Sequence, residues 1–326
     1  MTQYFLKRFL GMTPLFIGIT LISFLVIHLA PGSVVDSNAN MNPKMTAAAK
    51  EKLAALYGLD KPVLVQYTDW MKRIGRFDFG TSYVDGQSVA KKIGEAMPVT
   101  LGINLAALFL IFLLGIPLGI FGAVRRGRGA DKLVTVLVFV GFSVSTVWLS
   151  MLLMSYFGVR LGWLPVSGIH SIFYDEFSFS EKIVDVSRHL VLPLLVASFT
   201  GIAGISRYAR SGMSQVLRKP YIRTARAKGL PENQVLYGHA LPNALLPVIT
   251  ILGLSLPGLF GGSVIFETIF SIPGMGRLLV NSVFSRDYPV IMGLLVLQGL
   301  LTLLGNFLAD LFYALADPRI RIGGHR

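Results

Sequence analysis

The side chains that usually carry catalysis occur in this chain without the spacings that catalysis requires. None of the five histidines lies in a His-Glu-x-x-His pattern, which argues against a zinc protease. The chain has no Gly-x4-Gly-Lys-Ser/Thr loop for nucleotide phosphates and no Gly-x-Ser-x-Gly elbow for a nucleophilic serine. It has no cysteine either, which excludes thiolate metal sites and disulfides. We therefore expect no catalytic, cofactor-binding or metal-binding residues.

The basic segment from Arg223 to Pro242 is different, because its residue types suit contact with a soluble partner. Its first part can form two helical turns with Ile222 and Ala225 on one face. Gly229 supplies a left-handed end for this helix, and Pro231 starts the next one. The predicted result is a pair of short helices at an angle, with a compact basic surface. A solvated loop whose cations only set membrane topology is the simpler alternative.

The rest of the chain is apolar enough to lie in a membrane. It is 53% hydrophobic and 14% charged, whereas a soluble domain carries about a quarter charged residues. Backbone polar groups in lipid must be satisfied internally, so helices are expected rather than open strands. Six apolar stretches are long enough to span a bilayer: 9–30, 99–123, 133–157, 189–208, 244–268 and 290–314. The sequence thus predicts an all-α integral membrane protein with about six transmembrane helices.

The distribution of charge predicts how these helices are oriented. The N-terminus, the loops 124–132 and 207–243 and the tail hold 16 of the 30 lysines and arginines, against three acidic residues. The opposite side is nearly balanced, with 14 basic and 13 acidic residues. The positive-inside rule therefore places both termini in the cytoplasm. A pI near 10 is also compatible with nucleic-acid binding, but these cations lie in short loops between apolar stretches, so no nucleic-acid partner is expected.

The N-terminal region is expected to be a membrane helix followed by a long external segment. The first apolar stretch is about twice as long as the core of a secretory signal, so we expect it to remain uncleaved. Residues 46–57 are expected to form a short amphipathic helix that ends before Gly58. A second helix then follows, whose apolar face would pack within a small helical cap or dock an external partner. The residues of that face are Tyr67, Trp70, Met71 and Ile74.

Glycine and proline are concentrated in the second, fourth and fifth apolar stretches. A static bundle would use these residues for close packing alone, whereas a transporter would also use the kinks and the carbonyls that proline leaves free. The fifth stretch, with Pro247, Pro257 and four glycines, favours a transporter. Pro273 and Gly274 then predict a tight turn within a re-entrant or interfacial element on the outer side. Two acidic residues near span ends are expected to be interfacial groups or helix-end partners rather than proton relays; they are Glu267 and Asp310.

The basic segment resembles the EAA loop of bacterial importer permeases of the ABC class. The pattern of that family is Glu-Ala-Ala-x3-Gly-x9-Ile-x-Leu-Pro; here Arg223 and Thr224 replace the glutamate and the first alanine, and His239 replaces the isoleucine. The variant Arg-Thr-Ala-Arg-Ala-Lys-Gly-Leu is similar to the dipeptide/oligopeptide/nickel branch. The corresponding coupling-loop residues are Arg223, Thr224, Ala225, Arg226, Ala227, Lys228, Gly229, Leu230, Pro231, His239, Leu241 and Pro242.

Other segments resemble the same branch in order and spacing, nearly from end to end. The long first external segment is similar to that of the B-type subunit rather than the C-type. The matching segments include Leu29-Ala-Pro-Gly32, Leu164-Pro-Val-Ser-Gly168, Phe266-Glu-Thr-Ile-Phe-Ser-Ile-Pro-Gly274, Arg286-Asp-Tyr-Pro289 and Asp317-Pro-Arg-Ile-Arg321.

The resemblance implies a type I ABC importer permease fold in the bacterial cytoplasmic membrane. It divides the chain into a transmembrane helix with an external helical segment (1–96), an importer transmembrane domain with its coupling loop at 210–243 (97–315), and a cytoplasmic tail (316–326). The implied partners are a homologous second permease, two cytosolic ATP-binding subunits that hydrolyse ATP, and an extracytoplasmic solute-binding protein.

The expected cargo is dipeptides or oligopeptides, and nickel or another small solute is the alternative within the same branch. Two other classes of protein are less consistent with the residues. An intramembrane enzyme needs paired catalytic groups at membrane depth, and none is evident. A passive channel or assembly scaffold has no need of the break at Gly229 and Pro231.

Overall fold

The computed structural model describes residues 2–29, 46, 52, 61–125, 127, 129–255 and 257–316. Within these residues the chain is helical and contains no strand. The α-helices are α1 (Thr2–Leu29), α4 (Val63–Ile74), α5 (Val89–Val124), α6 (Gly129–Ser143), α7 (Thr146–Leu153), α8 (Phe179–Val216), α9 (Pro220–Ala227), α10 (Leu241–Ala244), α11 (Leu246–Ser255), α12 (Val264–Ile269), α13 (Met275–Phe284) and α14 (Tyr288–Ala316). The π-helices η1 (Met154–Arg160) and η3 (Gln234–Ala240) and the 3-10 helices η2 (Tyr174–Glu176) and η4 (Pro257–Phe260) complete the described elements.

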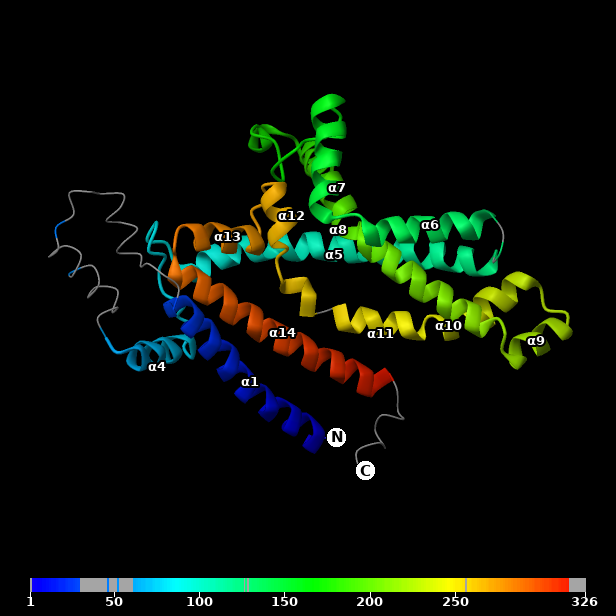
Figure 1. The fold of residues 1–326 in the computed structure, drawn as a ribbon, viewed down its shortest axis with the longest axis horizontal. Coiled ribbons are helices and arrows are strands. Elements are labelled where there is room, and N and C mark those ends of the chain that lie inside the picture. Colours follow the sequence, from blue (N-terminus) through cyan, green and yellow to red (C-terminus); the bar gives the residue numbers. More distant parts are fainter. Residues whose placement is uncertain are drawn as a thin grey trace.

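The two longest helices, α5 and α8, form the central pair of the molecule (Figure 1). Their contact depends on small residues, as the sequence predicts. A Cβ atom added at Gly119 would lie 2.7 Å from the Cβ of Ala209, and one added at Gly201 would lie 2.7 Å from Cγ1 of Ile111. Larger side chains at either glycine would push the helices apart, so glycine sets the distance between their backbones.

Four helices contain segments long and apolar enough to cross a membrane, and two bent pairs bring the number of candidate spans to six. The four segments are Leu10–Ile27, Val89–Val124, Phe179–Val216 and Tyr288–Leu308. These findings confirm an all-α chain with several membrane-spanning helices. The third and fifth predicted spans, however, are not single continuous helices.

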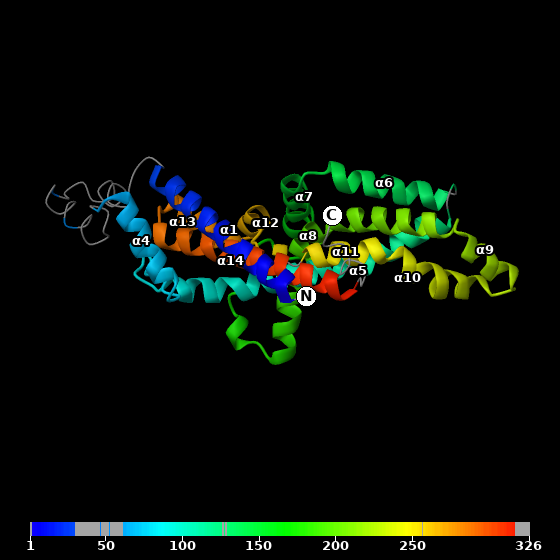
Figure 2. The same ribbon diagram turned by 90° about the horizontal axis from the view of Figure 1, so that it is seen from below.

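The third predicted span is broken between α6 and α7. Val134–Ser143 and Thr146–Arg160 meet at an angle of 102°, so that α6 runs along α8 while α7 turns away from it (Figures 1 and 2). No proline lies at the break, and Gly141 lies in the last turn of α6 before it. There α6 packs closely on α8, because Gly141 lies against Ala203 and the hydroxyl of Thr200 donates to the carbonyl of Gly141 at 3.3 Å.

The fifth predicted span is broken as well, and here the sequence gives the reason. Gln234–Ala244 and Leu246–Phe260 meet at 44°, and α12 follows only after the glycines at 261 and 262. Pro247 and Pro257 each lack an N–H group, and a proline inside a helix clashes with the preceding turn. The kinks expected from the composition of this stretch are therefore present.

The helix α4 packs on the membrane helices instead of forming a separate cap. Trp70 and Ile74 are buried in a cluster with Phe24 of α1 and with Ile291 and Met292 of α14. The predicted apolar face is correct, but both roles proposed for it are wrong, because α1 and α14 cover it. The expected helix at 46–57 lies outside the described residues apart from 46 and 52.

The outer junction between α12 and α13 is organised around one buried carboxylate. Glu267 is 1% exposed and accepts a hydrogen bond from the hydroxyl of Thr100 on α5, at 3.0 Å. It also accepts from the backbone N–H groups of Ser263 (3.2 Å), Gly276 (2.8 Å) and Arg277 (3.1 Å). Glu267 is thus a helix-end partner, because it satisfies N–H groups in the first turn of α13. The side chain of Asp310 lies outside the described residues.

Candidate functional site

The basic segment of the sequence forms an elbow at one end of the molecule. In both ribbon views α9 lies at the end opposite to α4 (Figures 1 and 2). The helix α8 ends at Val216, and Pro220 occupies the first turn of α9. Proline is favoured in the first turn because an N–H group there has no acceptor within the helix, so that its absence in proline loses no hydrogen bond. Pro220 therefore marks the point where the chain restarts as a new helix.

An apolar cluster joins the inner face of this elbow to the central helices. Ile222 is fully buried and Ala225 is 8% exposed, as expected for one face of α9. The cluster includes residues of α5, α8, η3 and α10 as well as α9. Its buried members are Ala123, Met213, Val216, Ile222, Ala225, Val235, Ala240 and Ala244. Close-packed side chains therefore connect α9 directly to α8 and α10.

The turn of the elbow is a Schellman motif. Gly229 has φ +79°, and its N–H donates to the carbonyl of Arg226 at 2.9 Å. The N–H of Leu230 donates to the carbonyl of Ala225 at 3.4 Å. Leu230 also packs against the apolar cluster that contains Ala225. These contacts are those of a glycine-terminated helix with its accompanying apolar contact, so the predicted left-handed end is present.

A salt bridge spans the elbow on its exposed side. The guanidinium of Arg226 donates from Nε to Oε2 of Glu232 at 3.0 Å and from Nη2 to Oε1 at 2.6 Å. Donation by Arg226 lowers the pKa of the Glu232 carboxyl below its ordinary value, and the same pairing raises the pKa of Arg226. The bridge thus joins a residue of α9 to a residue that follows the turn.

The second arm is a π-helix, η3, which the sequence pattern does not predict. Its end is closed by a bond from the N–H of Leu241 to the carbonyl of Leu236. Pro242 follows Leu241 directly. Because proline has no N–H group, an α-helix that continued from η3 through Pro242 would lose one backbone hydrogen bond. π-Helices are uncommon and are frequent at functional sites.

Most of the predicted coupling-loop residues are exposed on the elbow. Ala225 is buried, and Leu230 and Leu241 are half-buried beneath the surface. The exposed members are Arg223, Thr224, Arg226, Ala227, Lys228, Gly229, Pro231, His239 and Pro242. The exposed face of the elbow is thus basic and polar, and the face beneath it is apolar and buried. Such an arrangement suits contact with another protein, and no group of three or more His, Cys, Asp or Glu in the described part of the chain could hold a metal ion.

Comparison with known proteins agrees with this geometry. Residues 115–322 match the family model of the binding-protein-dependent transport system inner membrane component, and residues 1–104 match that of its N-terminal region. The chain belongs to this family. It is a multi-pass inner-membrane permease.

Relatives of this permease match over almost its whole length. It is 42% identical to the oligopeptide transport system permease protein AppB of Bacillus subtilis, over 98% of this chain and 99% of the relative. It is 38% identical to the di/tripeptide transport system permease protein DppB of Pseudomonas aeruginosa, over 97% and 98%.

A solved structure supports the fold alone. The structure titled as inward-facing conformations of the MetNI methionine ABC transporter aligns with a TM-score of 0.54 at 18% identity, over 70% of this chain and 97% of that one. The type I importer permease fold implied by the sequence is therefore confirmed.

Some features of the permease surface escape sequence reasoning. Tyr221 and Tyr237 are 44% and 62% exposed on the two arms of the elbow. Exposed aromatic residues are frequent in protein interfaces, where they supply large contact areas. Their only signal in the sequence is one aromatic residue in each short helix, which is too general to distinguish them.

Proposed function

We propose that this chain is a permease subunit of an ATP-driven importer of dipeptides and oligopeptides. The names of its relatives support this cargo, since AppB and DppB are described as oligopeptide and di/tripeptide permeases. The chain lacks a phosphate-binding loop, so the ATP is hydrolysed by partner subunits.

The elbow is the proposed contact with those ATP-binding subunits. The single observation that carries this proposal is the two-sided construction of α9, whose exposed face is basic while Ile222 and Ala225 on its inner face are buried among residues of α5, α8 and α10. A force applied to the exposed face reaches the membrane helices through close-packed contacts. The coupling-loop residues Arg223–Pro242 thus act as one mechanical unit.

The remaining partners follow from the proposed mechanism. The permease forms the translocation pathway with a homologous second permease, and an extracytoplasmic binding protein delivers the peptide. Two cytosolic ATPases dock on the elbows of the two permeases. Their closure on binding ATP switches the pathway between inward-facing and outward-facing states, because nucleotide binds one state more tightly than the other. The broken fifth segment, α10 to α12, supports such a pathway by freeing backbone carbonyls.

Reconstitution of the complete importer tests this function. Proteoliposomes that contain this chain, the second permease and both ATPases are expected to accumulate a labelled dipeptide presented by the binding protein, and only with ATP. Nickel uptake under the same conditions is the matched comparison. ATP-dependent uptake of nickel without uptake of dipeptide would overturn the peptide assignment.

A further inference from the structure

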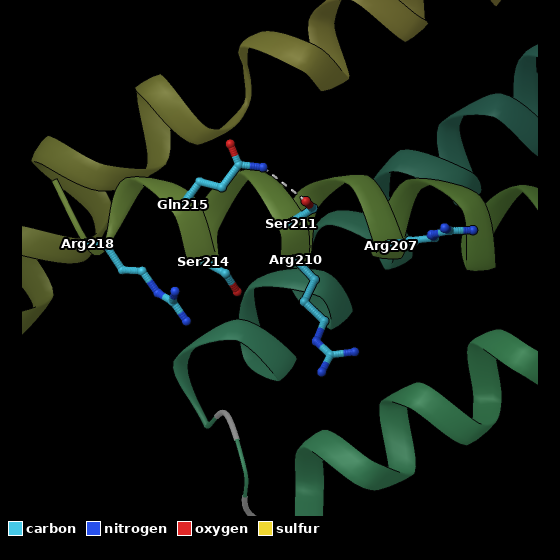
Figure 3. A pocket seen from close by; sticks show the side chains of 6 residues that line it. All are labelled: Arg207, Arg210, Ser211, Ser214, Gln215 and Arg218. Carbon is cyan, nitrogen blue, oxygen red and sulfur yellow. Dashed lines mark hydrogen bonds between the residues drawn. The ribbon is translucent and has the colours of Figure 1, made fainter.

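A pocket of about 330 Å³ lies along the part of α8 that continues beyond its apolar stretch (Figure 3). Every side chain that lines it is polar, and none is acidic. The lining residues are Arg207, Arg210, Ser211, Ser214, Gln215 and Arg218. The elbow site does not use any of them, so this pocket is a separate feature of the permease.

The lining residues follow the helical repeat of α8. Intervals of three or four residues separate Arg207, Ser211, Ser214 and Arg218, which places them on one face of the helix. Figure 3 shows that Arg210, Ser214 and Arg218 extend from the same side of α8 toward the adjoining ends of α5 and α6. The opposite face is buried through Ala209, Met213 and Val216. The pocket is therefore a polar stripe on the accessible side of a well-packed helix.

One of the three arginines is already paired, whereas the other two have no acidic partner among the residues that the structure describes. Nη2 of Arg210 lies 2.5 Å from Oδ1 of Asp131, and its Nη1 donates to the hydroxyl of Thr135 at 2.9 Å. Among the described residues, neither Arg207 nor Arg218 forms a salt bridge. Both side chains are exposed. Two positive charges thus remain available at the two ends of the pocket.

The other polar groups can donate hydrogen bonds. Nε2 of Gln215 donates to the hydroxyl of Ser211 at 3.2 Å, which leaves the proton of that hydroxyl available to a ligand. The hydroxyl of Ser214 lies between Arg210 and Arg218 in Figure 3. A site lined by guanidinium and hydroxyl donors suits a phosphate, which accepts several such bonds at once.

The depth of the pocket identifies the source of the phosphate. Arg207 lies at the end of the apolar stretch 189–208, on the side predicted to be cytosolic, so the pocket lies at the level of the lipid headgroups. Anionic lipids attract basic groups near membrane helices, and basic pockets between such helices bind anionic headgroups. We propose that this pocket binds the phosphate of an anionic phospholipid of the cytosolic leaflet.

The function of the bound lipid would follow from its place on α8. Arg218 lies two residues before Pro220, where α9 begins. A headgroup held in this pocket would connect the membrane surface to the helix that leads directly to the elbow. Basic residues that only set membrane topology need no pocket and no hydroxyl groups. The geometry therefore favours a lipid-binding site over cations that only set topology.

Native mass spectrometry of the full chain tests the proposal. The protein, purified in detergent with equal amounts of phosphatidylglycerol and phosphatidylcholine, is expected to retain phosphatidylglycerol preferentially. Replacement of Arg207→Gln together with Arg218→Gln should reduce that retention at least fivefold. The matched control removes two exposed cations on the same predicted side, Lys132→Gln and Lys219→Gln, and should retain the lipid as the unmodified protein does.

A second variant tests the pocket without a change of charge. Ser214→Leu fills the space between Arg210 and Arg218 and should lower retention to the same extent. Unchanged retention in Ser214→Leu, or equal losses in the arginine variant and its lysine control, would contradict the proposal. If inorganic phosphate displaces phosphatidylglycerol completely at millimolar concentration, the site takes the free anion and the lipid assignment is wrong.

Discussion

The elbow at Gly229 and the outer junction between α12 and α13 both redirect the chain between helices, but different interactions hold them. At the elbow the only charged contact among the described residues is the exposed bridge from Arg226 to Glu232. At the outer junction Glu267 is 1% exposed and accepts four hydrogen bonds. The salt bridge at the elbow is screened by water, whereas the buried hydrogen bonds of Glu267 are not.

The glycines of the two regions also serve different purposes. Gly229 has φ +79° and no atom within 4 Å of an added Cβ, so the backbone conformation alone requires glycine there. A Cβ at Gly276 would lie 2.7 Å from the backbone nitrogen of Val264, so that space requires glycine. The outer junction is therefore a packed, fixed unit. The elbow is a conformational unit whose surface remains open to a partner.

The largest expected effect of a single change is at the buried carboxylate. Glu267→Ala leaves the hydroxyl of Thr100 and three backbone N–H groups without their acceptor, and each unsatisfied buried group costs about 1–3 kcal/mol. We expect a loss of about 3 kcal/mol or more in the free energy of unfolding, measured by denaturant titration in detergent.

The matched change at the elbow is Glu232→Ala. Because Arg226 and Glu232 are exposed, their bridge contributes no more than about 1 kcal/mol to stability. Equal losses in the two alanine variants would contradict the distinction between a fixed junction and an open elbow.

The next effect concerns transport. Gly229→Val places a β-branched residue at φ +79°, which such residues resist, and should reduce ATP-dependent uptake at least tenfold while the protein remains in the membrane. Gly229→Asn is the control, because asparagine tolerates this conformation and should retain most of the uptake. Unchanged uptake in Gly229→Val would argue strongly against the elbow as a mechanical element.

Much of the elbow follows from the sequence because its determinants are local. Pro220 and Gly229 each act on adjacent backbone, so the helix boundaries and the buried face with Ile222 can be read from neighbouring residues. The overall all-α class follows equally from the long apolar stretches.

The features that the sequence does not predict depend on contacts between distant residues. Thr100 and Glu267 are 167 positions apart, and no local pattern indicates that they meet. The packing of α4 on α1 and α14 likewise depends on neighbouring helices, and no local pattern indicates the break between α6 and α7. The pairing of Arg226 with Glu232 spans only six residues, but it requires the elbow angle to be known first.

The smallest effect is the dependence of the elbow on pH. The pKa of Glu232 is lowered from its ordinary value of 4.5 by donation from Arg226. The bridge therefore contributes fully above pH 4.5 and is lost as the pH falls through the lower value of the folded state. The difference in thermal stability between the unmodified chain and Glu232→Gln should be constant at neutral pH and disappear in acid. A difference that grows on acidification would contradict this role.

The central claim is that the exposed face of α9 contacts the ATP-binding subunits, and crosslinking tests it most directly. The chain contains no cysteine, so a single cysteine is unambiguous. In the assembled importer, Ala227→Cys is expected to crosslink to an ATP-binding subunit, whereas Val84→Cys, exposed on the predicted outer side, should not. Absence of crosslinks at Ala227 and also at Thr224 and Lys228, or equal crosslinking at Val84, would contradict the account.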